Sequence, residues 1–264
     1  MAERNDFPHK VAEVMRAVIG KTEKKYYTSA VILAAGSSTR MGSEVTKQFL
    51  CVAGIPVVAR SVIEFERSEF IDEIIIVAKK EEISSYEGFA EKYGITKPFK
   101  VIEGGETRQI SARNGVDAVN GKSKFVAIHD AARCLITQDL ISRVCHGAYL
   151  HKGAVLAIRA TDTVKIGDKS AFVESTPERK LTWQAQTPQV FGVNAFRAAS
   201  YIARDEGFEG TDDASLLEHI RIPVKLVEGS RENIKITEKC DVYFAEAVLR
   251  AREEAKEKAE EAKE

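Results

Sequence analysis

An α/β fold with a mostly parallel sheet is the fold class that this chain of 264 residues predicts. Short apolar runs bounded by turn residues alternate with longer segments whose apolar residues recur at helical spacing, as in strands joined by crossover helices. Residues 161–182 interrupt this rhythm with a strand-like alternation around a Gly-Asp turn, which indicates a protruding β-arm. The length falls between one and two typical domains, and we expect a single large domain.

The individual elements follow from these two patterns in chain order. The expected strands are short apolar runs at residues 30–33, 73–78, 99–102, 125–128, 154–158 and 224–227. The expected helices repeat apolar residues at three-to-four spacing at residues 57–67, 108–119, 140–150 and 195–204. We therefore expect a sheet covered by helices, with ligands bound beyond the carboxyl ends of its strands.

The two ends of the chain differ from this central pattern. Residues 1–27 carry a modest helical pattern and are interpreted as a helical N-terminal extension without chemistry of its own. Residues 28–249 form the single domain. Residues 250–264 are rich in Ala, Glu, Lys and Arg and are expected to continue a helix that begins near Glu238 as a charged, solvated tail.

Composition excludes several classes of protein. Lys plus Arg number 39 and Asp plus Glu number 40, so the net charge of −1 gives no cationic field for binding nucleic acid or a membrane surface. The apolar runs are too short to cross a bilayer. The four cysteines are far apart without a CxxC pair, which argues against a zinc ribbon or a disulfide framework. We expect reduced thiols and a cytoplasmic protein.

The loop after the first strand is a candidate anion site. Small residues there would let backbone N–H groups approach phosphate oxygens, with Arg40 and Lys47 as countercharges. Neither GxGxxG nor the Gly-Lys-Ser/Thr of a Walker loop occurs in it, which lowers the odds of a dehydrogenase or an ordinary NTPase. From spacing alone, a plain turn with two solvated cations stays open. The loop consists of Ala34, Ala35, Gly36, Ser37, Ser38, Thr39 and Arg40.

An ordered set of motifs resembles the nucleotidyltransferase family that cytidylylates methylerythritol phosphate. The first motif is Leu33-Ala34-Ala35-Gly36 with Arg40, Met41 and Lys47. The others follow in order as residues 104–108 with Ser111, 129–133, 162–165, Arg179, 187–189, 211–215 and 228–237. Cys134 stands where the family usually has proline. The resemblance implies a Rossmann-like three-layer nucleotidyltransferase domain.

The resemblance also implies a reaction. A phosphate oxygen of the acceptor would attack the α-phosphorus of CTP in line and expel magnesium pyrophosphate. Fixed cations would offset the charge of the two anions and of the transition state, whereas no general base is needed for an ionised phosphate. The family positions assign this catalytic role to Arg40, Lys47 and Lys235.

Nucleotide and metal contacts are implied in the same way. The first loop, Ala34 to Thr39, would bind the triphosphate, and a second glycine loop would bind the base through Gly105, Glu106 and Ser111. Asp130 and Ala131 would also contact the nucleotide. Asp130 would lie near a Mg²⁺ cofactor whose ligands come mainly from CTP phosphates. His129 is interpreted as a structural strand-end residue.

The acceptor, a polyol phosphate, would be held by two subunits. The family pattern implies contacts from Asp130, Arg133, Thr187 and Thr211 of one chain and from Thr163 and Arg179 on the β-arm of another, and therefore a homodimer. Two alternatives stay open. Ribitol 5-phosphate could replace methylerythritol phosphate as the acceptor. The chain could also be a nucleotide-binding sensor or scaffold without turnover, although the presence of Arg40, Lys47, Asp130 and Lys235 together argues against that.

Overall fold

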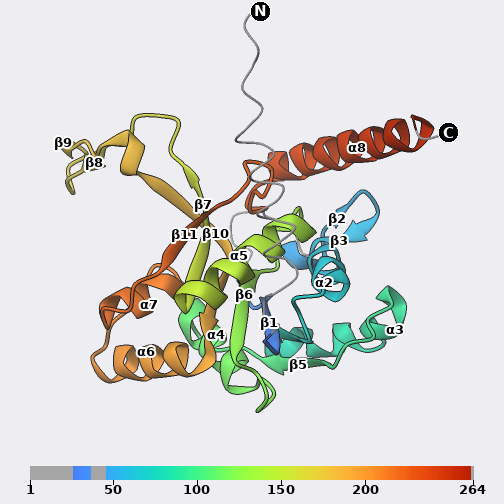
Figure 1. Cartoon of the computed structure of the whole chain (residues 1–264), viewed down its shortest axis with the longest axis horizontal. Coiled ribbons are helices and arrows are strands. Elements are labelled where there is room, and N and C mark those ends of the chain that lie inside the picture. Colours follow the sequence, from blue (N-terminus) through green and yellow to red (C-terminus); the bar gives the residue numbers. More distant parts are fainter. Residues whose placement is uncertain (1–25, 37–45, 263–264) are drawn as a thin grey trace, which may run out of the picture.

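A seven-stranded mixed sheet forms the centre of the computed structural model, which describes residues 26–36 and 46–262 except the side chain of Lys47 (Figure 1). The first 25 residues, which hold most of the expected N-terminal helix, lie outside the described residues. In spatial order the strands are β11 (Lys225–Glu228), β7 (Gly153–Arg159), β10 (Trp183–Gly192), β6 (Phe125–Asp130), β1 (Thr28–Leu33), β4 (Glu73–Ala78) and β5 (Phe99–Glu103).

Six of these strands share one direction, and β10 runs antiparallel to both of its neighbours, β6 and β7. The six correspond to the six expected strands, so the predicted α/β class with a mostly parallel sheet is confirmed. The strand β10 is not among the expected strands. It enters the middle of the sheet, with a register shift between Ala185 and Gln189 against β7.

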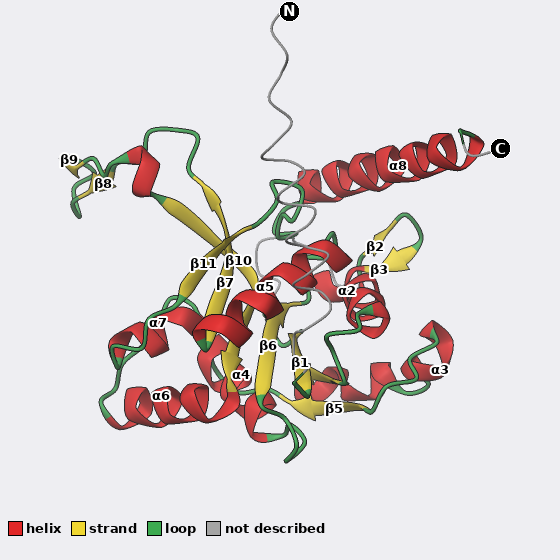
Figure 2. Ribbon diagram, in the orientation of Figure 1, coloured by secondary structure: helices red, strands yellow, loops and turns green. Residues whose placement is uncertain are grey.

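Helices cover both faces of the sheet (Figure 2). One face packs α2 (Val57–Arg67) and α5 (Gln138–His151), and the other packs α4 (Arg108–Asp117), α6 (Val193–Asp205) and α7 (Asp213–His219). In β1, Ala30 and Ile32 belong to the first apolar cluster and Val31 to the second. Because both faces are buried, the strand is a continuous apolar run rather than an alternating one. The helix α3 (Phe89–Tyr93) and the turns η1 (Lys47–Phe49) and η2 (Lys80–Tyr86) complete this part of the chain.

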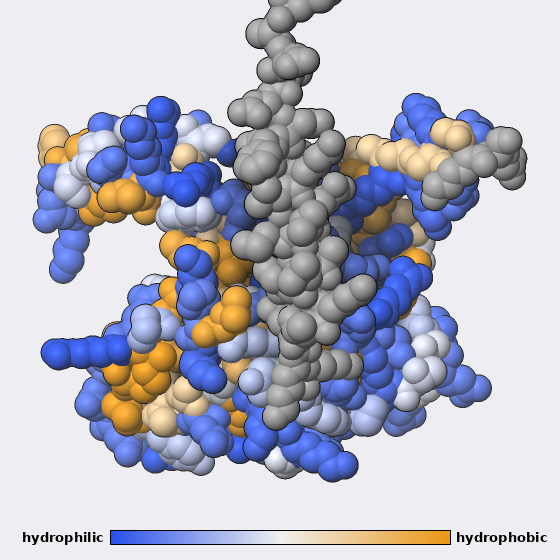
Figure 3. All heavy atoms as spheres, viewed as in Figure 1, coloured by the Kyte–Doolittle hydropathy of each residue, from blue (hydrophilic) through white to orange (hydrophobic). Residues whose placement is uncertain are grey.

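The predicted β-arm extends away from the body of the molecule (Figure 1). It carries β8 (Ile166–Gly167) paired antiparallel with β9 (Val173–Ser175), followed by the turn η3 (Arg179–Leu181). The loop between the strands is closed by Asp168, whose carboxylate accepts the backbone N–H groups of Ser170 and Phe172 at 2.9 Å each. Phe172 is 73% exposed, and apolar side chains lie among charged ones on the arm (Figure 3).

The last helix, α8 (Lys239–Glu261), packs on a third, smaller apolar cluster. This cluster joins α8, through Ala245, to the hairpin of β2 (Cys51–Val52) and β3 (Ile55–Pro56), to Leu135 and to Ile236. In the part of the chain that the structure describes, no helix combines the length and apolar character that a membrane crossing needs. All four cysteines are free thiols, as expected.

Candidate active site

A cavity of about 450 Å³ opens where β1, β4, β5 and β6 reach their carboxyl ends. Its walls come from the segments that follow these strands and from Lys235, which lies late in the chain. This is the edge at which open α/β sheets bind ligands. Eight residues assigned to the nucleotide from sequence line it: Ala34, Ala35, Gly36, Gly105, Glu106, Ser111, Asp130 and Ala131.

Two of the loops that line this cavity touch each other. The N–H of Ala34, after β1, donates to the carbonyl of Val77 at 2.8 Å, and the N–H of Gly104, after β5, donates to the carbonyl of Ala78 at 2.8 Å. A Cβ added to Gly104 would lie 2.8 Å from the Cβ of Ala35. Glycine is therefore required at residue 104 so that the two loops can touch.

The second loop is fixed by its own hydrogen bonds at the start of α4. The backbone N–H of Gly105 donates to the hydroxyl of Ser111 at 3.0 Å, and that hydroxyl lies 3.3 Å from the Gly105 carbonyl. Thr107 caps α4 by accepting the N–H of Ile110 at 3.1 Å. A Cβ on Gly105 would overlap the side chain of Ile110. The loop is therefore supported by contacts within the protein itself.

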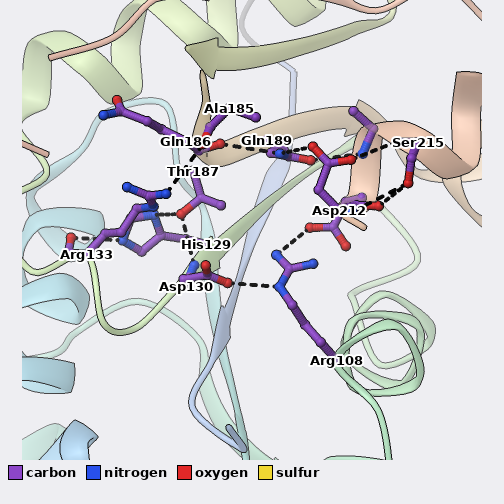
Figure 4. Close-up of polar contacts among 12 residues, drawn as sticks. Arg108, His129, Asp130, Arg133, Ala185, Gln186, Thr187, Gln189, Asp212 and Ser215 are labelled. Atoms are coloured by element: carbon purple, nitrogen blue, oxygen red, sulfur yellow. Dashed lines mark hydrogen bonds and ion pairs between the residues drawn. The ribbon is translucent and has the colours of Figure 1, made fainter. Parts of the chain in front are cut away.

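A chain of alternating charges runs from Lys235 in the cavity to the buried Asp213. Asp130, at the end of β6, accepts Arg108 Nε at 3.0 Å on one carboxylate oxygen and Lys235 Nζ at 2.7 Å on the other. Arg108 also donates through Nη2 to Asp213 at 2.8 Å. Figure 4 shows Arg108 reaching Asp130 from α4. Asp130 and Asp213 are 8% and 1% exposed, so these cations are needed to offset the cost of burying the two carboxylates.

The electrostatic consequences differ between the two carboxylates. Burial alone would raise the pKa of Asp130, but Arg108 and Lys235 hold that pKa well below its usual range, so the group is ionised. Burial raises the pKa of Asp213 despite its contact with Arg108. Burial opposes the charge of Arg108 as well, yet its two carboxylate partners raise its pKa above the ordinary value. Arg108 is thus a permanent cation between two acids.

His129 has a structural environment, as interpreted from sequence. It is fully buried; its Nε2 lies 3.2 Å from the Arg133 carbonyl and its Nδ1 lies 3.0 Å from the Thr187 hydroxyl. Burial lowers the pKa of His129 to about 3, so the ring is neutral. Because the Arg133 carbonyl can only accept, Nε2 carries the proton. The Thr187 hydroxyl also accepts the N–H of Asp130 at 3.0 Å, so it is engaged inside the protein.

The segment that carries Lys235 is fastened to the loop after β6. The N–H of Ile236 donates to the Ala132 carbonyl at 2.8 Å, and Arg133 Nη1 donates to the Asn233 carbonyl at 2.7 Å. Asn233 is buried and donates from its side chain to the Thr187 carbonyl at 3.0 Å. The Nε of Arg133 is buried and has no hydrogen-bond partner within the described residues.

Other residues assigned from sequence lie apart from the cavity or outside the described residues. Thr163 and Arg179 are exposed on the β-arm, and Arg179 donates to the Thr161 carbonyl at 3.4 Å. Thr211 is exposed in the segment before α7. Residues 37–40, with the predicted Ser37, Ser38, Thr39 and Arg40, lie outside the described residues, as does the side chain of Lys47.

Several residues of this site received no role from sequence, and four of them have charged or amide side chains. Arg108 and Asp213 lie inside the quoted motifs, but only the structure reveals that they share an ion pair. Lys79 and Gln48 line the cavity. Lys79 directly follows β4, and that position at a strand's carboxyl end is a signal that could have identified it. Gln48 is held by a hydrogen bond of 2.6 Å to Glu82, which no sequence pattern indicates.

Comparisons with known proteins agree with this geometry. The family model of 2-C-methyl-D-erythritol 4-phosphate cytidylyltransferase matches residues 28–251. A relative of that name from Caldanaerobacter subterraneus subsp. tengcongensis is 45% identical over 223 residues, which is 84% of this chain and 98% of the relative. One from Geobacter metallireducens is 39% identical over 225 residues, with 84% and 97% covered.

Solved structures give the same result. The crystal structure of 4-diphosphocytidyl-2C-methyl-D-erythritol synthase from Anaerococcus prevotii superposes with a TM-score of 0.77 and 31% identity, covering 86% of this chain and 100% of that one. A 2-C-methyl-D-erythritol 4-phosphate cytidylyltransferase structure from Thermus thermophilus gives a TM-score of 0.68 and 29% identity, with 85% and 99% covered. On these matches, the chain belongs to the 2-C-methyl-D-erythritol 4-phosphate cytidylyltransferase family.

Proposed function

We propose that the protein transfers the cytidylyl group of CTP to 2-C-methyl-D-erythritol 4-phosphate. A phosphate oxygen of the acceptor forms a bond to the α-phosphorus of CTP, and the bond from that phosphorus to the bridging oxygen of pyrophosphate breaks. The products are 4-diphosphocytidyl-2-C-methyl-D-erythritol and pyrophosphate. Besides the family, the observation that carries the proposal is the amine of Lys235, held 2.7 Å from Asp130 in the cavity.

Lys235 is the described residue best suited to stabilise the transition state. Its side chain is 35% exposed and lines the cavity, so its amine is accessible to a triphosphate. Fixed cations lower the barrier because charge develops on the phosphoryl oxygens during transfer. We assign the same role to Arg40 and Lys47 from their positions in the family's first motif. No general base is needed, because the attacking phosphate is already ionised near neutral pH.

The nucleotide would occupy the part of the cavity formed by the two touching loops. The backbone of Ala34, Ala35 and Gly36 continues into Ser37, Ser38 and Thr39, which together would bind the phosphates. The loop of Gly105 and Glu106, fixed by Ser111, would hold the cytosine. Each polar group of a buried base that lacks a hydrogen-bond partner costs about 1–3 kcal/mol. A loop whose hydrogen-bonding groups fit cytosine would therefore favour CTP over other nucleotides. Asp130 and Ala131 would lie beside the ribose and phosphates.

Magnesium is the cofactor that this donor set fits best. Among the described residues, no group of three or more His, Cys, Asp or Glu could hold a metal ion. Asp130 is an ionised carboxylate at the cavity, so it could supply one hard oxygen ligand while CTP phosphates supply others. Bound Mg²⁺ would neutralise the leaving pyrophosphate. Asp130 itself orients Lys235 and Arg108.

The acceptor would lie beside the loop of Arg133. Arg133 directly follows the cavity residues Asp130, Ala131 and Ala132, and its place in the family motif of residues 129–133 supports a role in binding the acceptor. We assign Thr187 and Thr211 to the same region, with Thr187 acting through its hydrogen bond to the Asp130 amide. Thr163 and Arg179 would complete the site from the β-arm of a second copy. We therefore propose a homodimer, working in the cytoplasm.

The direct test follows pyrophosphate release from CTP with each of two acceptors, with and without magnesium. We expect turnover with methylerythritol phosphate, little with ribitol 5-phosphate, and loss of activity on chelation that magnesium restores. Turnover with ribitol phosphate alone would move the protein to the sister activity. Tight CTP binding without turnover of either acceptor would favour a sensor.

A further inference from the structure

The guanidinium of Arg252 joins two loops of the site from outside the cavity. Its Nε and Nη2 donate to one carboxylate oxygen of Glu232 at 3.1 and 2.7 Å, and Nη2 also lies 3.0 Å from the carbonyl of Leu135. Glu232 precedes Lys235 in the late segment, and Leu135 follows Arg133 in the loop after β6. Arg252 comes directly after the last residue that the family model matches, so the match assigns it no role.

Besides the third apolar cluster, which includes Leu135 and Ile236, few hydrogen bonds or ion pairs link the two loops that Arg252 joins. Their backbones meet through the bond from the Ile236 N–H to the Ala132 carbonyl. Other direct links use the side chains of Arg133, to the Asn233 carbonyl, and Lys235, to Asp130. Lys235 lines the cavity, so its amine would also contact a bound phosphate. Arg252 does not line the cavity, so its hydrogen bonds to Glu232 and Leu135 would persist when substrate binds.

Contacts other than those of Arg252 also hold α8 in place. The start of the helix is capped by Asp241, which accepts the N–H groups of Thr237 and Glu238 at 2.7 and 2.8 Å. The fully buried Ala245 belongs to the third apolar cluster, and the Ala53 N–H donates to Glu246 at 3.3 Å. The contacts of Arg252 therefore act on the loops rather than on the helix.

We propose that Arg252 is a positioning residue, which clamps the segment of Lys235 to the loop of Arg133 and so sets the distance between transition-state stabilisation and acceptor binding. Guanidinium suits this task because its planar fork can bond a carboxylate and a carbonyl at once, whereas an ammonium is a point charge. The kinetic part of this proposal rests on the proposed function. The structural part does not.

The kinetic test compares Arg252→Met with Arg250→Met, which changes an exposed arginine on the same helix. A misplacement of about 1 Å can lower a rate by up to about 100-fold, so we expect kcat/KM for methylerythritol phosphate to fall roughly tenfold in Arg252→Met. The KM for CTP should change less than this, because the loop assigned to the cytosine lies on another element and keeps its own hydrogen bonds. Arg252→Lys should restore only part of the loss.

Glu232→Gln supplies the second arm of a double-mutant cycle. If Arg252 and Glu232 act as one clamp, the double variant should lose no more activity than Arg252→Met alone. Fully additive losses would show that the two residues act separately and would overturn the clamp. An Arg252→Met protein with kinetics equal to those of Arg250→Met would overturn it as well.

Hydrogen exchange separates this proposal from the proposed function. The amide of Ile236 should exchange about tenfold faster in Arg252→Met than in Arg250→Met, because local opening of the two loops becomes easier. Equal exchange in the two variants would overturn the clamp even in an active enzyme. Faster exchange in a protein that turns over neither acceptor would sustain the clamp and reject the function.

Discussion

The cavity and the β-arm hold their predicted site residues in opposite ways. In the cavity, Asp130 is buried and bound by two cations, so the charged groups are oriented before substrate arrives. On the arm, Thr163 and Arg179 are exposed, and Phe172 and Leu181 are 73% and 74% exposed beside them. One region has its charges paired within a single chain, whereas the other exposes apolar and charged side chains for which we propose a contact with a second copy.

The largest difference between the two regions should appear in catalysis at Lys235. Lys235→Met removes a cation from the cavity, and losing one transition-state donor typically lowers kcat about 10²–10³-fold. The matched control is Lys225→Met, which changes an exposed lysine on β11 outside the cavity. Pyrophosphate release at saturating CTP measures the effect. A kcat within about twofold of the control would remove Lys235 from the catalytic step.

Stability should distinguish the regions next. Arg108→Met removes the cation that pairs with the buried Asp213 and one of the two cations that pair with Asp130, and we expect the free energy of unfolding to drop by about 3 kcal/mol. Arg179→Met on the arm should change it by less than about 0.5 kcal/mol, as exposed substitutions do. Urea denaturation followed by circular dichroism compares the two. Equal losses would mean that the charge chain is not an internal support.

The pH dependence of the free energy of unfolding should arise from the region of the cavity rather than from the β-arm. Burial lowers the pKa of His129 from 6.5 to about 3, so the folded state binds this proton less readily than the unfolded state. The stability that this contributes is complete above pH 6.5 and is lost as the pH falls from 6.5 toward 3, at up to about 1.4 kcal/mol per pH unit.

Urea titrations between about pH 7 and pH 4.5 measure this slope. His129→Asn should flatten it, whereas Phe172→Ser should keep it, because residues 161–182 contain no histidine. The pKa of Asp130 is also lower in the folded protein than its ordinary value of 3.8. The stability that this group contributes is therefore lost as the pH falls below 3.8. A slope that His129→Asn leaves unchanged would assign the effect to other groups.

The smallest effect on folding is expected on the arm itself. Phe172→Ser should leave the free energy of unfolding within about 0.5 kcal/mol of the parent at low protein concentration. If the arm joins two copies, the same change should weaken the dimer measurably in sedimentation velocity experiments. A dimer as stable as the parent would place the contact between copies elsewhere.

The sheet was largely predictable, and its one unexpected strand shows the limit of sequence patterns. The run at β4 is apolar almost throughout because both its faces are buried. The strand β10 instead contains Thr187, Pro188 and three glutamines, and proline is unusual inside a sheet because it cannot donate to a neighbouring strand. Its register shift lies at this point, so the break in the pattern corresponds to a real irregularity.

The site was predictable as a set of motifs but not as a set of contacts. Lys235 and Asp130 were assigned from their motifs, and their ion pair explains why both are near the cavity. The role of Arg108 could not be inferred, because it comes from an ion pair with Asp213, which lies far along the chain. Asp213 needs this cation because it is buried. Spacing within a motif carries no information about such distant partners.

The third apolar cluster has a consequence for how the protein is made. Every strand of the central sheet ends by Glu228, whereas α8 occupies Lys239–Glu261 and is the last described element to leave the ribosome. Chains fold during synthesis as segments emerge. A nascent chain can therefore build its sheet early, but the loops that α8 packs against gain their support only after α8 has been synthesised.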